Sequence, residues 1–281
     1  MLVLKIAAGL GVGYAAIAGG LYLLQDLLVF PGTARPSRPF VGTPQPRRVD
    51  LATANGVVLH GLVFERPGAS DLVLGFGGNA QDAEHLAADL LARLPGQHLV
   101  VFHYRGFGRS NGAPSEQALV DDAVAIYDRM VPELAPERVF AVGVSLGSGV
   151  AAQLARARPL SGLLLITPFD SIAAIARERY RWLPVDRLLK HPFDSVGALR
   201  GRPIPVAVIA AEDDRVVRPA RTAALLEGLA NIVYARTIDD AGHASIHDLR
   251  DYDEAFRNAM AALASAARGP AAGLEIETAA E

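Results

Sequence analysis

The sequence predicts an α/β fold in which a mostly parallel central sheet is flanked by helices and preceded by an N-terminal transmembrane helix. From residue 72 onward, short apolar runs typical of buried strands alternate with segments of helical periodicity. This alternation is characteristic of parallel sheets that are covered on both faces. Ahead of it, at 6–24, stands a run of 19 residues without a charge. Hydrophobic residues make up 51% of the 281-residue chain, which fits a globular domain plus such an apolar segment.

The apolar run at 6–24 is long enough to cross a bilayer. As a helix it would span about 28 Å, close to the hydrocarbon thickness of a membrane. We predict an uncleaved, single-pass membrane anchor over 1–28, because apolar residues resume at Leu27 and no polar face is present. A signal peptide cleaved near Ala18 and a buried core helix are the alternatives. The positive-inside rule favours a cytoplasmic C-terminal domain, since basic residues follow the span: Arg35, Arg38, Arg47 and Arg48.

The rest of the chain divides into a connector, a main domain and a tail. Residues 29–48 are rich in Pro and Arg and predict an extended connector. The main domain, 49–267, begins with strands at 49–54 and 57–65 joined by a hairpin turn at Asn55-Gly56. Further strands are expected at 72–74, 98–103, 138–144, 162–166, 205–210 and 231–238, and helices at 83–94, 115–130, 147–157, 220–229 and 246–266. The tail 268–281 has no periodicity and is predicted to be disordered.

Composition excludes several classes of function. A net charge of −3 and the lack of a basic stripe argue against nucleic-acid binding. The absence of cysteine removes disulfides, thiolate metal sites and cysteine nucleophiles. His243 and His247 have the spacing of a metal pair, but no zinc-protease glutamate or carboxylate cluster accompanies them, so we expect no metal and no cofactor. His247 is expected on a helix surface, and the remaining histidines are expected to be structural.

The most specific motif is the stretch GVSLG at 143–147. It follows an apolar strand and opens a helix, which is the setting of a nucleophile elbow. Glycines two residues before and after Ser145 leave room for the sharp turn that exposes a nucleophile. The helix N-terminus behind the serine also favours negative charge that develops nearby. The alternative is a glycine-rich helix start with a capping serine.

A nucleophilic serine needs a base, and the base needs an orienting carboxylate. Glu212, Asp213 and Asp214 follow the strand expected at 205–210. We favour Asp214, which stands at the head of the turn before the next helix, with Asp213 as the alternative. His243 follows the strand expected at 231–238, and functional groups of α/β sheets gather past strand ends. The sequence therefore predicts Ser145 as nucleophile, His243 as base and Asp214 as orienter.

The loop LGFGGNA at 74–80 carries the Gly-x-Gly-x-x-Ala spacing of a dinucleotide-binding loop. That function needs an acidic residue at the end of the next strand, which this chain lacks. Arg105 could bind the 2′-phosphate of NADP instead, but an oxidoreductase would leave the serine, aspartate and histidine unexplained. We favour an oxyanion hole, in which the backbone N–H groups of Asn79 and Leu146 bind the developing negative charge.

Together these motifs resemble the α/β-hydrolase superfamily, and within it the small membrane-anchored, serine-aminopeptidase-like group that includes the ABHD-type depalmitoylases. The matching stretches, in family order between 25 and 243, are QDLLVFPG, FGGNA, HYRGFGRSNGAPSE, GVSLGS, EDDRVV and AGH. The resemblance implies the same roles for Ser145, His243 and Asp214. Many relatives have His-Gly-Asn-Ala where this chain has Gly-Gly-Asn-Ala at 77–80, so the support of that loop is expected to differ. RGFGRSNG is expected to pack beside the site without a catalytic role.

Residues 168–203 predict a short cap over the site. We expect its apolar side chains to face the site, namely Ile172, Ile175, Tyr180 and Trp182. Its basic side chains are expected to point outward, namely Arg177, Arg179 and Arg181. An ordinary surface helix is the alternative. A short cap and an anchor suit lipid-like acyl substrates held at the membrane.

The expected function is a membrane-anchored serine hydrolase that cleaves carboxylic esters or thioesters through an acyl-enzyme. A serine aminopeptidase-like peptidase and a non-catalytic scaffold on the same fold are the alternatives. The acyl chain, the leaving group, the partner and the oligomeric state stay open at this point.

Overall fold

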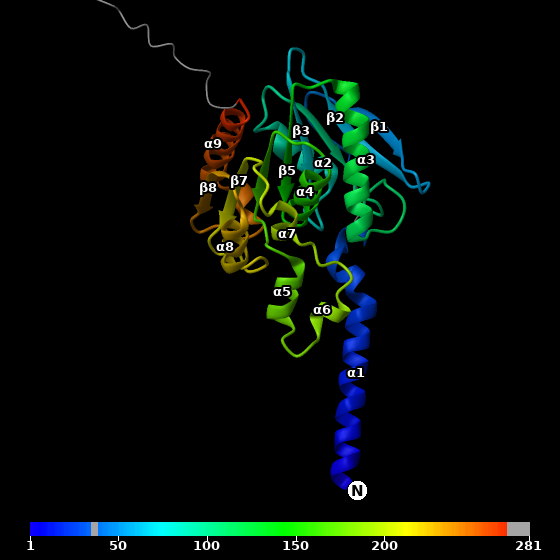
Figure 1. Cartoon of the computed structure of the whole chain (residues 1–281). Coiled ribbons are helices and arrows are strands. Elements are labelled where there is room, and N and C mark those ends of the chain that lie inside the picture. The colour runs from blue at the N-terminus through cyan, green and yellow to red at the C-terminus, as the bar shows by residue number, and fades with distance from the viewer. Residues whose placement is uncertain (35–38, 269–281) are drawn as a thin grey trace, which may run out of the picture.

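A computed structural model describes residues 1–34 and 39–268. Its centre, within 39–268, is an eight-stranded sheet in the order β1-β2-β4-β3-β5-β6-β7-β8 (Figure 1). β1 and β2 form an antiparallel hairpin, β2 is antiparallel to β4, and the strands from β4 to β8 pair in parallel. The predicted mostly parallel sheet is therefore confirmed. The strands are β1 Arg47–Ala52, β2 Val58–Phe64, β3 Asp71–Phe76, β4 His98–Phe102, β5 Arg138–Val144, β6 Gly162–Ile166, β7 Val206–Ala211 and β8 Ile232–Ile238.

Helices cover both faces of the sheet, as the alternating sequence pattern predicts. On β5, Val139 and Ala141 belong to one buried apolar cluster, whereas Phe140 and Val142 belong to the other. This alternation arises because successive strand side chains point to opposite faces. The first cluster includes side chains of α3 (Glu116–Leu134), α4 (Leu146–Ala157) and α8 (Pro219–Gly228). The second includes side chains of α2 (Ala83–Leu91) and α9 (Arg250–Ala266).

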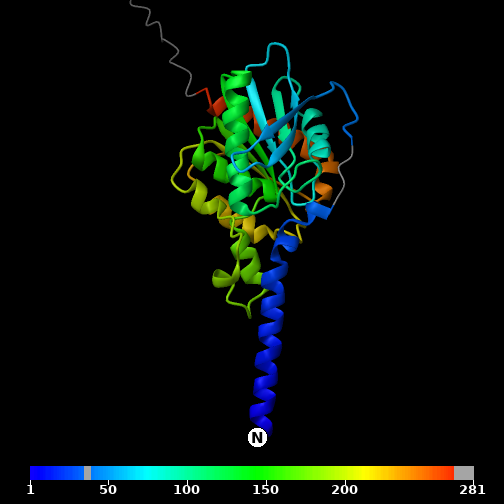
Figure 2. The ribbon, with the colours of Figure 1, turned by 90° about the vertical axis from the view of Figure 1, so that its right-hand side faces the viewer.

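The N-terminal helix α1 (Leu2–Val29) projects from the domain as one long rod (Figures 1 and 2). It is long and apolar enough to cross a membrane, and none of its most apolar window is buried. Two short helices lie beside its C-terminal half, α5 (Ile172–Arg179) and α6 (Val185–Leu188). The predicted cap therefore packs against α1.

The start of the predicted connector is folded into the domain. Phe30 is completely buried in the first apolar cluster, and the short 3-10 helix η1 (Pro31–Ala34) follows it. Gly32 N donates a hydrogen bond to Asn79 O at 3.0 Å. The expected extended connector thus differs at its first residues, because Phe30 has an apolar layer to enter. Residues 35–38 and the predicted disordered tail from 269 lie outside the described residues.

The remaining elements refine the predicted boundaries. The last predicted helix divides into the 3-10 helix η2 (Ser245–Asp248) and α9. The cap region ends in a short helix, α7 (Ser195–Leu199), which packs on α4. Because strands β3 to β8 are parallel, their C-terminal ends meet at one edge of the sheet. The loops that carry Asn79, Ser145, Asp214 and His243 all follow such strand ends.

Candidate active site

Ser145 lies at the sharp turn between β5 and α4. Its backbone has φ 50° and ψ −115°, a conformation that side-chain-bearing residues rarely adopt. The flanking glycines make the turn possible. A Cβ on Gly143 would lie 2.4 Å from Gly147 O, and a Cβ on Gly147 would lie 2.0 Å from Phe76 O. The strained turn and the two close backbone approaches are those of a nucleophile elbow.

The structure brings the three predicted side chains into one hydrogen-bonded line. His243 Nε2 lies 2.8 Å from Ser145 Oγ, and His243 Nδ1 lies 2.6 Å from Asp214 Oδ2. With the Nδ1 proton donated to the carboxylate, Nε2 can accept the proton of the serine hydroxyl. The Asp214 side chain is 3% exposed and that of His243 is 17% exposed. The imidazole thus has a solvent-accessible edge and a buried anionic partner.

The choice of Asp214 among three acidic neighbours has a structural reason. Asp214 Oδ1 accepts hydrogen bonds from the backbone N–H groups of Val216 (2.9 Å) and Val217 (2.7 Å), which leaves Oδ2 for His243. Glu212 and Asp213 are exposed, and Glu212 instead accepts a hydrogen bond from Asp240 N. Asp214 is therefore the buried carboxylate of the three, with one oxygen held by two backbone donors and the other on His243.

The loop after β3 lies against the serine. A Cβ on Gly78 would be 3.7 Å from Ser145 Cβ. Gly78 N donates to Gln81 Oε1 at 3.0 Å, so this N–H is already used. Within the described residues, neither Asn79 N nor Leu146 N donates a hydrogen bond. Leu146 is the first residue of α4, where backbone N–H groups have no partner inside the helix. Leu146, which follows the serine, and Asn79, in the loop that lies against it, thus each have an unused backbone donor.

Comparison with known proteins identifies the family of the chain. Residues 71–196 match the family described as serine aminopeptidase, S33. The uncharacterized protein Rv2307c of Mycobacterium tuberculosis is 32% identical over 240 residues, covering 82% of this chain and 85% of the relative. The chain belongs to the α/β-hydrolase superfamily.

Other relatives refine this assignment. The lysophosphatidylserine lipase ABHD12 of Danio rerio is 34% identical over 140 residues, which cover 43% of this chain and 37% of that lipase. The Pyrococcus furiosus esterase Pf2001 has the same fold, with a TM-score of 0.64, 19% identity and coverage of 83% of this chain and 97% of the esterase. An α/β-hydrolase from Vibrio vulnificus has a TM-score of 0.65, 20% identity and coverage of 86% and 91%. The activity of this chain is accordingly of the serine-hydrolase type.

Two residues support the oxyanion loop of this α/β-hydrolase that the sequence patterns do not reveal. The Tyr104 hydroxyl donates to Gly77 O at 2.9 Å, and burial raises the pKa of this hydroxyl above its usual value of 10. Gln81 accepts from Gly78 N, and its own N–H donates back to Gly78 O. Tyr104 and Gln81 thus hold the loop at Gly77 and Gly78. Tyr104 directly precedes the RGFGRSNG stretch.

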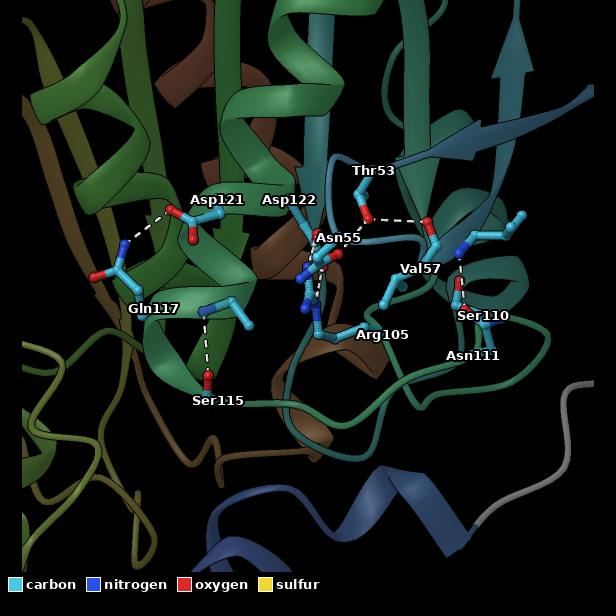
Figure 3. A network of polar contacts seen from close by, with 12 residues as sticks. Thr53, Asn55, Val57, Arg105, Ser110, Asn111, Ser115, Gln117, Asp121 and Asp122 are labelled. Atoms are coloured by element: carbon cyan, nitrogen blue, oxygen red, sulfur yellow. Dashed lines mark hydrogen bonds and ion pairs between the residues drawn. The ribbon is translucent and has the colours of Figure 1, made fainter.

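Polar contacts anchor the same stretch to the rest of the domain (Figure 3). Asn111 Oδ1 accepts from Val58 N at 2.8 Å. The Arg105 guanidinium forms a two-pronged, buried ion pair with Asp122 of α3. Burial raises the pKa of the Asp122 carboxyl, and Arg105 opposes this shift. Arg105 is therefore not available to bind a 2′-phosphate, which removes the NADP alternative.

The dinucleotide interpretation of loop 74–80 also fails at the following helix. α2 begins at Ala83, and the carboxylate of Asp82 caps it by accepting a hydrogen bond from Glu84 N at 3.0 Å. In a dinucleotide site the pyrophosphate would use these N–H groups. A carboxylate in that place would repel a phosphate.

The histidine pair considered for a metal is not formed. His247 lies in η2, where its Nδ1 is 3.4 Å from Asp89 Oδ2 and its ring packs on Tyr252. Among the described residues, Asp82, Glu84 and His103 offer three ligand atoms within 4.8 Å of one another. However, Arg48 lies 3.5 Å and His103 Nε2 lies 2.9 Å from the two oxygens of Glu84. Both oxygens of Glu84 thus already have a nitrogen neighbour within the protein.

The cap corrects one expectation. Ile172, Ile175 and Tyr180, predicted to face the active site, line a groove against α1. Trp182 contacts Tyr14 of α1, with ring centroids 5.7 Å apart. The apolar side chains of the cap therefore pack against α1 and not over the predicted site. Arg179, expected to point outward, is exposed at the edge of the same groove.

Proposed function

We propose that this protein is a membrane-anchored serine hydrolase that cleaves carboxylic ester or thioester bonds of lipid-like acyl substrates. The observation that carries this proposal is the line of hydrogen bonds from Asp214 through His243 to Ser145. The lipase and esterase among its relatives support ester substrates. The length and apolar composition of α1 support anchoring.

The proposed reaction has two halves. Ser145 Oγ attacks the acyl carbonyl carbon as His243 Nε2 takes its proton, and the N–H groups of Asn79 and Leu146 bind the oxyanion. The oxyanion then collapses, the bond to the alcohol or thiol breaks, and His243 returns the proton to that leaving group. An acyl-enzyme ester remains on Ser145. Water attacks it with His243 again as base, which releases the carboxylic acid and restores the serine.

The first test is labelling with a fluorophosphonate probe, which reacts with activated serines. The detergent-solubilised wild type should be labelled and Ser145→Ala should not. Ser161→Ala provides the matched control, because Ser161 Oγ only accepts a backbone hydrogen bond from Val139. Esters and thioesters of increasing chain length then define the substrate. A folded wild type that resists labelling would favour a non-catalytic scaffold instead.

A peptidase is the second candidate, because residues 71–196 match a family described as serine aminopeptidase. It would use the same side chains on an amide. Release of the N-terminal residue from aminoacyl amides distinguishes the two candidates. Cleavage of these amides in preference to esters would replace the esterase proposal.

A further inference from the structure

An apolar groove runs between the anchor helix and the cap. Its volume is about 360 Å³, near the lower end of the range of roughly 300–1,000 Å³ for small-ligand sites. Leu21 and Leu28 of α1 form one wall, and Ile172, Ile175 and Leu183 form the other. An elongated molecule with a single apolar chain suits this size and lining.

Polar contacts fix the two walls relative to each other. Gln25 is 7% exposed, its Oε1 accepts from Lys190 N at 2.8 Å and its Nε2 donates to Leu188 O at 3.1 Å. Asp26 Oδ1 lies 2.9 Å from His191 Nε2. These contacts join the end of α1 to the end of the cap. The groove is therefore a defined feature of the fold.

The groove opens where the chain would leave the membrane. Its α1 residues run from Ala18 to Val29, so its lower part lies within the apolar span 6–24. Tyr14 OH donates to Trp182 O at 3.2 Å, which places the tip of the cap beside the same span. If α1 spans a bilayer, the surroundings of the groove mouth are lipid chains.

A cation stands at the edge of the groove. Arg179 is exposed and lines the groove, and within the described part of the chain it has no ion-pair partner. Arg177, two residues earlier and also exposed, is instead paired with Asp186 at 2.9 Å. An available guanidinium beside an apolar groove suits a ligand with an anionic head and an apolar chain.

The inner end of the groove reaches the first apolar cluster, which also includes side chains of the helix that carries the elbow. Ile172 begins α5 directly after the loop from β6, and it packs against the first apolar cluster. In that cluster Phe169 and Phe193 reach α4, where each would lie 3.0 Å from a Cβ on Gly149. A chain held in the groove would therefore lie on the same side of the sheet as Ser145.

We propose that the groove binds one acyl chain of an anionic membrane lipid, with the head group on Arg179, and that α1 is thus part of the substrate site. This inference rests on the proposed function, and it names the substrate class. The lipid enters sideways from the bilayer, so that its chain never crosses water.

Filling the groove from the anchor side tests the proposal. Ala18→Phe places a ring in the groove, whereas Ala16→Phe adds the same ring to the opposite, exposed side of α1. We expect Ala18→Phe to lower kcat/KM for a sixteen-carbon ester at least tenfold. Hydrolysis of a four-carbon ester and fluorophosphonate labelling should change less than twofold. Equal effects of the two variants, or equal losses of activity on both esters, would contradict acyl-chain binding in the groove.

The head-group part is tested separately. Arg179→Gln should reduce the preference for an anionic over a zwitterionic ester lipid in mixed vesicles by about fivefold, the effect of one nearby cation. Arg177→Gln serves as the control because its charge is already paired. If Arg179→Gln left the preference for the anionic lipid unchanged, the guanidinium would not be part of the head-group site.

A binding measurement separates this inference from the catalytic proposal. A fatty-acyl lipid with a photoreactive diazirine, incorporated in vesicles with the full-length Ser145→Ala protein, should crosslink to peptides of α1 and α5. Adding Ala18→Phe should abolish these crosslinks. Crosslinking without ester hydrolysis by the wild type would support acyl-chain binding in the groove and contradict the proposed hydrolase activity. Ester hydrolysis without crosslinking would support the hydrolase activity and contradict acyl-chain binding in the groove.

Discussion

Gly147→Ala is the sharpest test of the elbow. The added methyl carbon would lie 2.0 Å from Phe76 O and 2.7 Å from Gly77 O, whereas ordinary contact begins at 3.4 Å. The turn and the oxyanion loop must therefore separate by about 1.4 Å. Both contacts are with backbone atoms, so no side-chain rotation can relieve them. The substitution thus moves the N–H groups of Leu146 and Asn79 apart.

The size of the effect follows from that displacement. A shift of about 1 Å in a reacting group costs on the order of 10²-fold in rate, and the loss of one oxyanion donor costs roughly 10²–10³-fold. We expect kcat/KM on a short-chain ester to fall at least about 10²-fold. Overpacking should also lower the free energy of unfolding by about 1–3 kcal/mol.

The assay compares ester hydrolysis, fluorophosphonate labelling and thermal unfolding in the variant and the wild type. Gly96→Ala is the matched control, because a Cβ there meets no atom within 4 Å. If folded Gly147→Ala kept activity within a few-fold of wild type, the close approach of turn and loop would not be needed for catalysis. The oxyanion-hole assignment would then be wrong.

Three further substitutions probe the surroundings of the serine. Asp214→Asn should lower kcat by about 10⁴-fold through the wrong imidazole tautomer, while Asp213→Asn stays near wild type in the same ester assay. Tyr104→Phe leaves the buried Gly77 carbonyl without its donor. It should lower the free energy of unfolding in denaturant by about 1–3 kcal/mol and reduce kcat more than it changes KM. A variant with wild-type stability and kcat would show that the hydroxyl does not support the loop. Burial raises the pKa of Glu116, so its ionised form is disfavoured in the folded state. Stability from this group is present below the unfolded pKa of about 4.3 and is lost as pH rises through the raised folded pKa. Glu116→Gln should therefore gain stability over the wild type in thermal unfolding at pH 8 but not at pH 4, and a pH-independent difference would count against the shift.

The sequence predicted the site residues that depend on local pattern. Ser145, Asp214 and His243 each follow a strand of a parallel sheet, and strand ends of such sheets converge. The glycine spacing around the serine and the order along the chain then restrict the choice. The same logic placed Asn79 after β3. Local sequence patterns were therefore enough to predict that four separate loops meet at one edge of the sheet.

Contacts between distant segments could not be predicted in this way. The apolar positions of α5 form a periodic face, but periodicity does not identify the surface that covers it. Tyr104 and Gly77 are brought together only by the pairing of β3 with β4. Arg105 could be considered a phosphate ligand until its partner Asp122, on another helix, was known. The connector was predicted from Pro and Arg content, which does not reveal that one phenylalanine within it enters the core.

The hydrogen bond from Gly32 to Asn79 has a consequence for where the enzyme can work. With Phe30 buried and Gln25 held by the cap, the end of α1 is fixed directly to the domain that carries the serine. A protein anchored by α1 cannot tilt or swing its active site toward a distant surface. It would therefore act in cis, on molecules of the leaflet in which it stands, and leave a neighbouring vesicle untouched. Removing α1 would not simply release a soluble enzyme, because it would also remove the α1 side chains that line the groove.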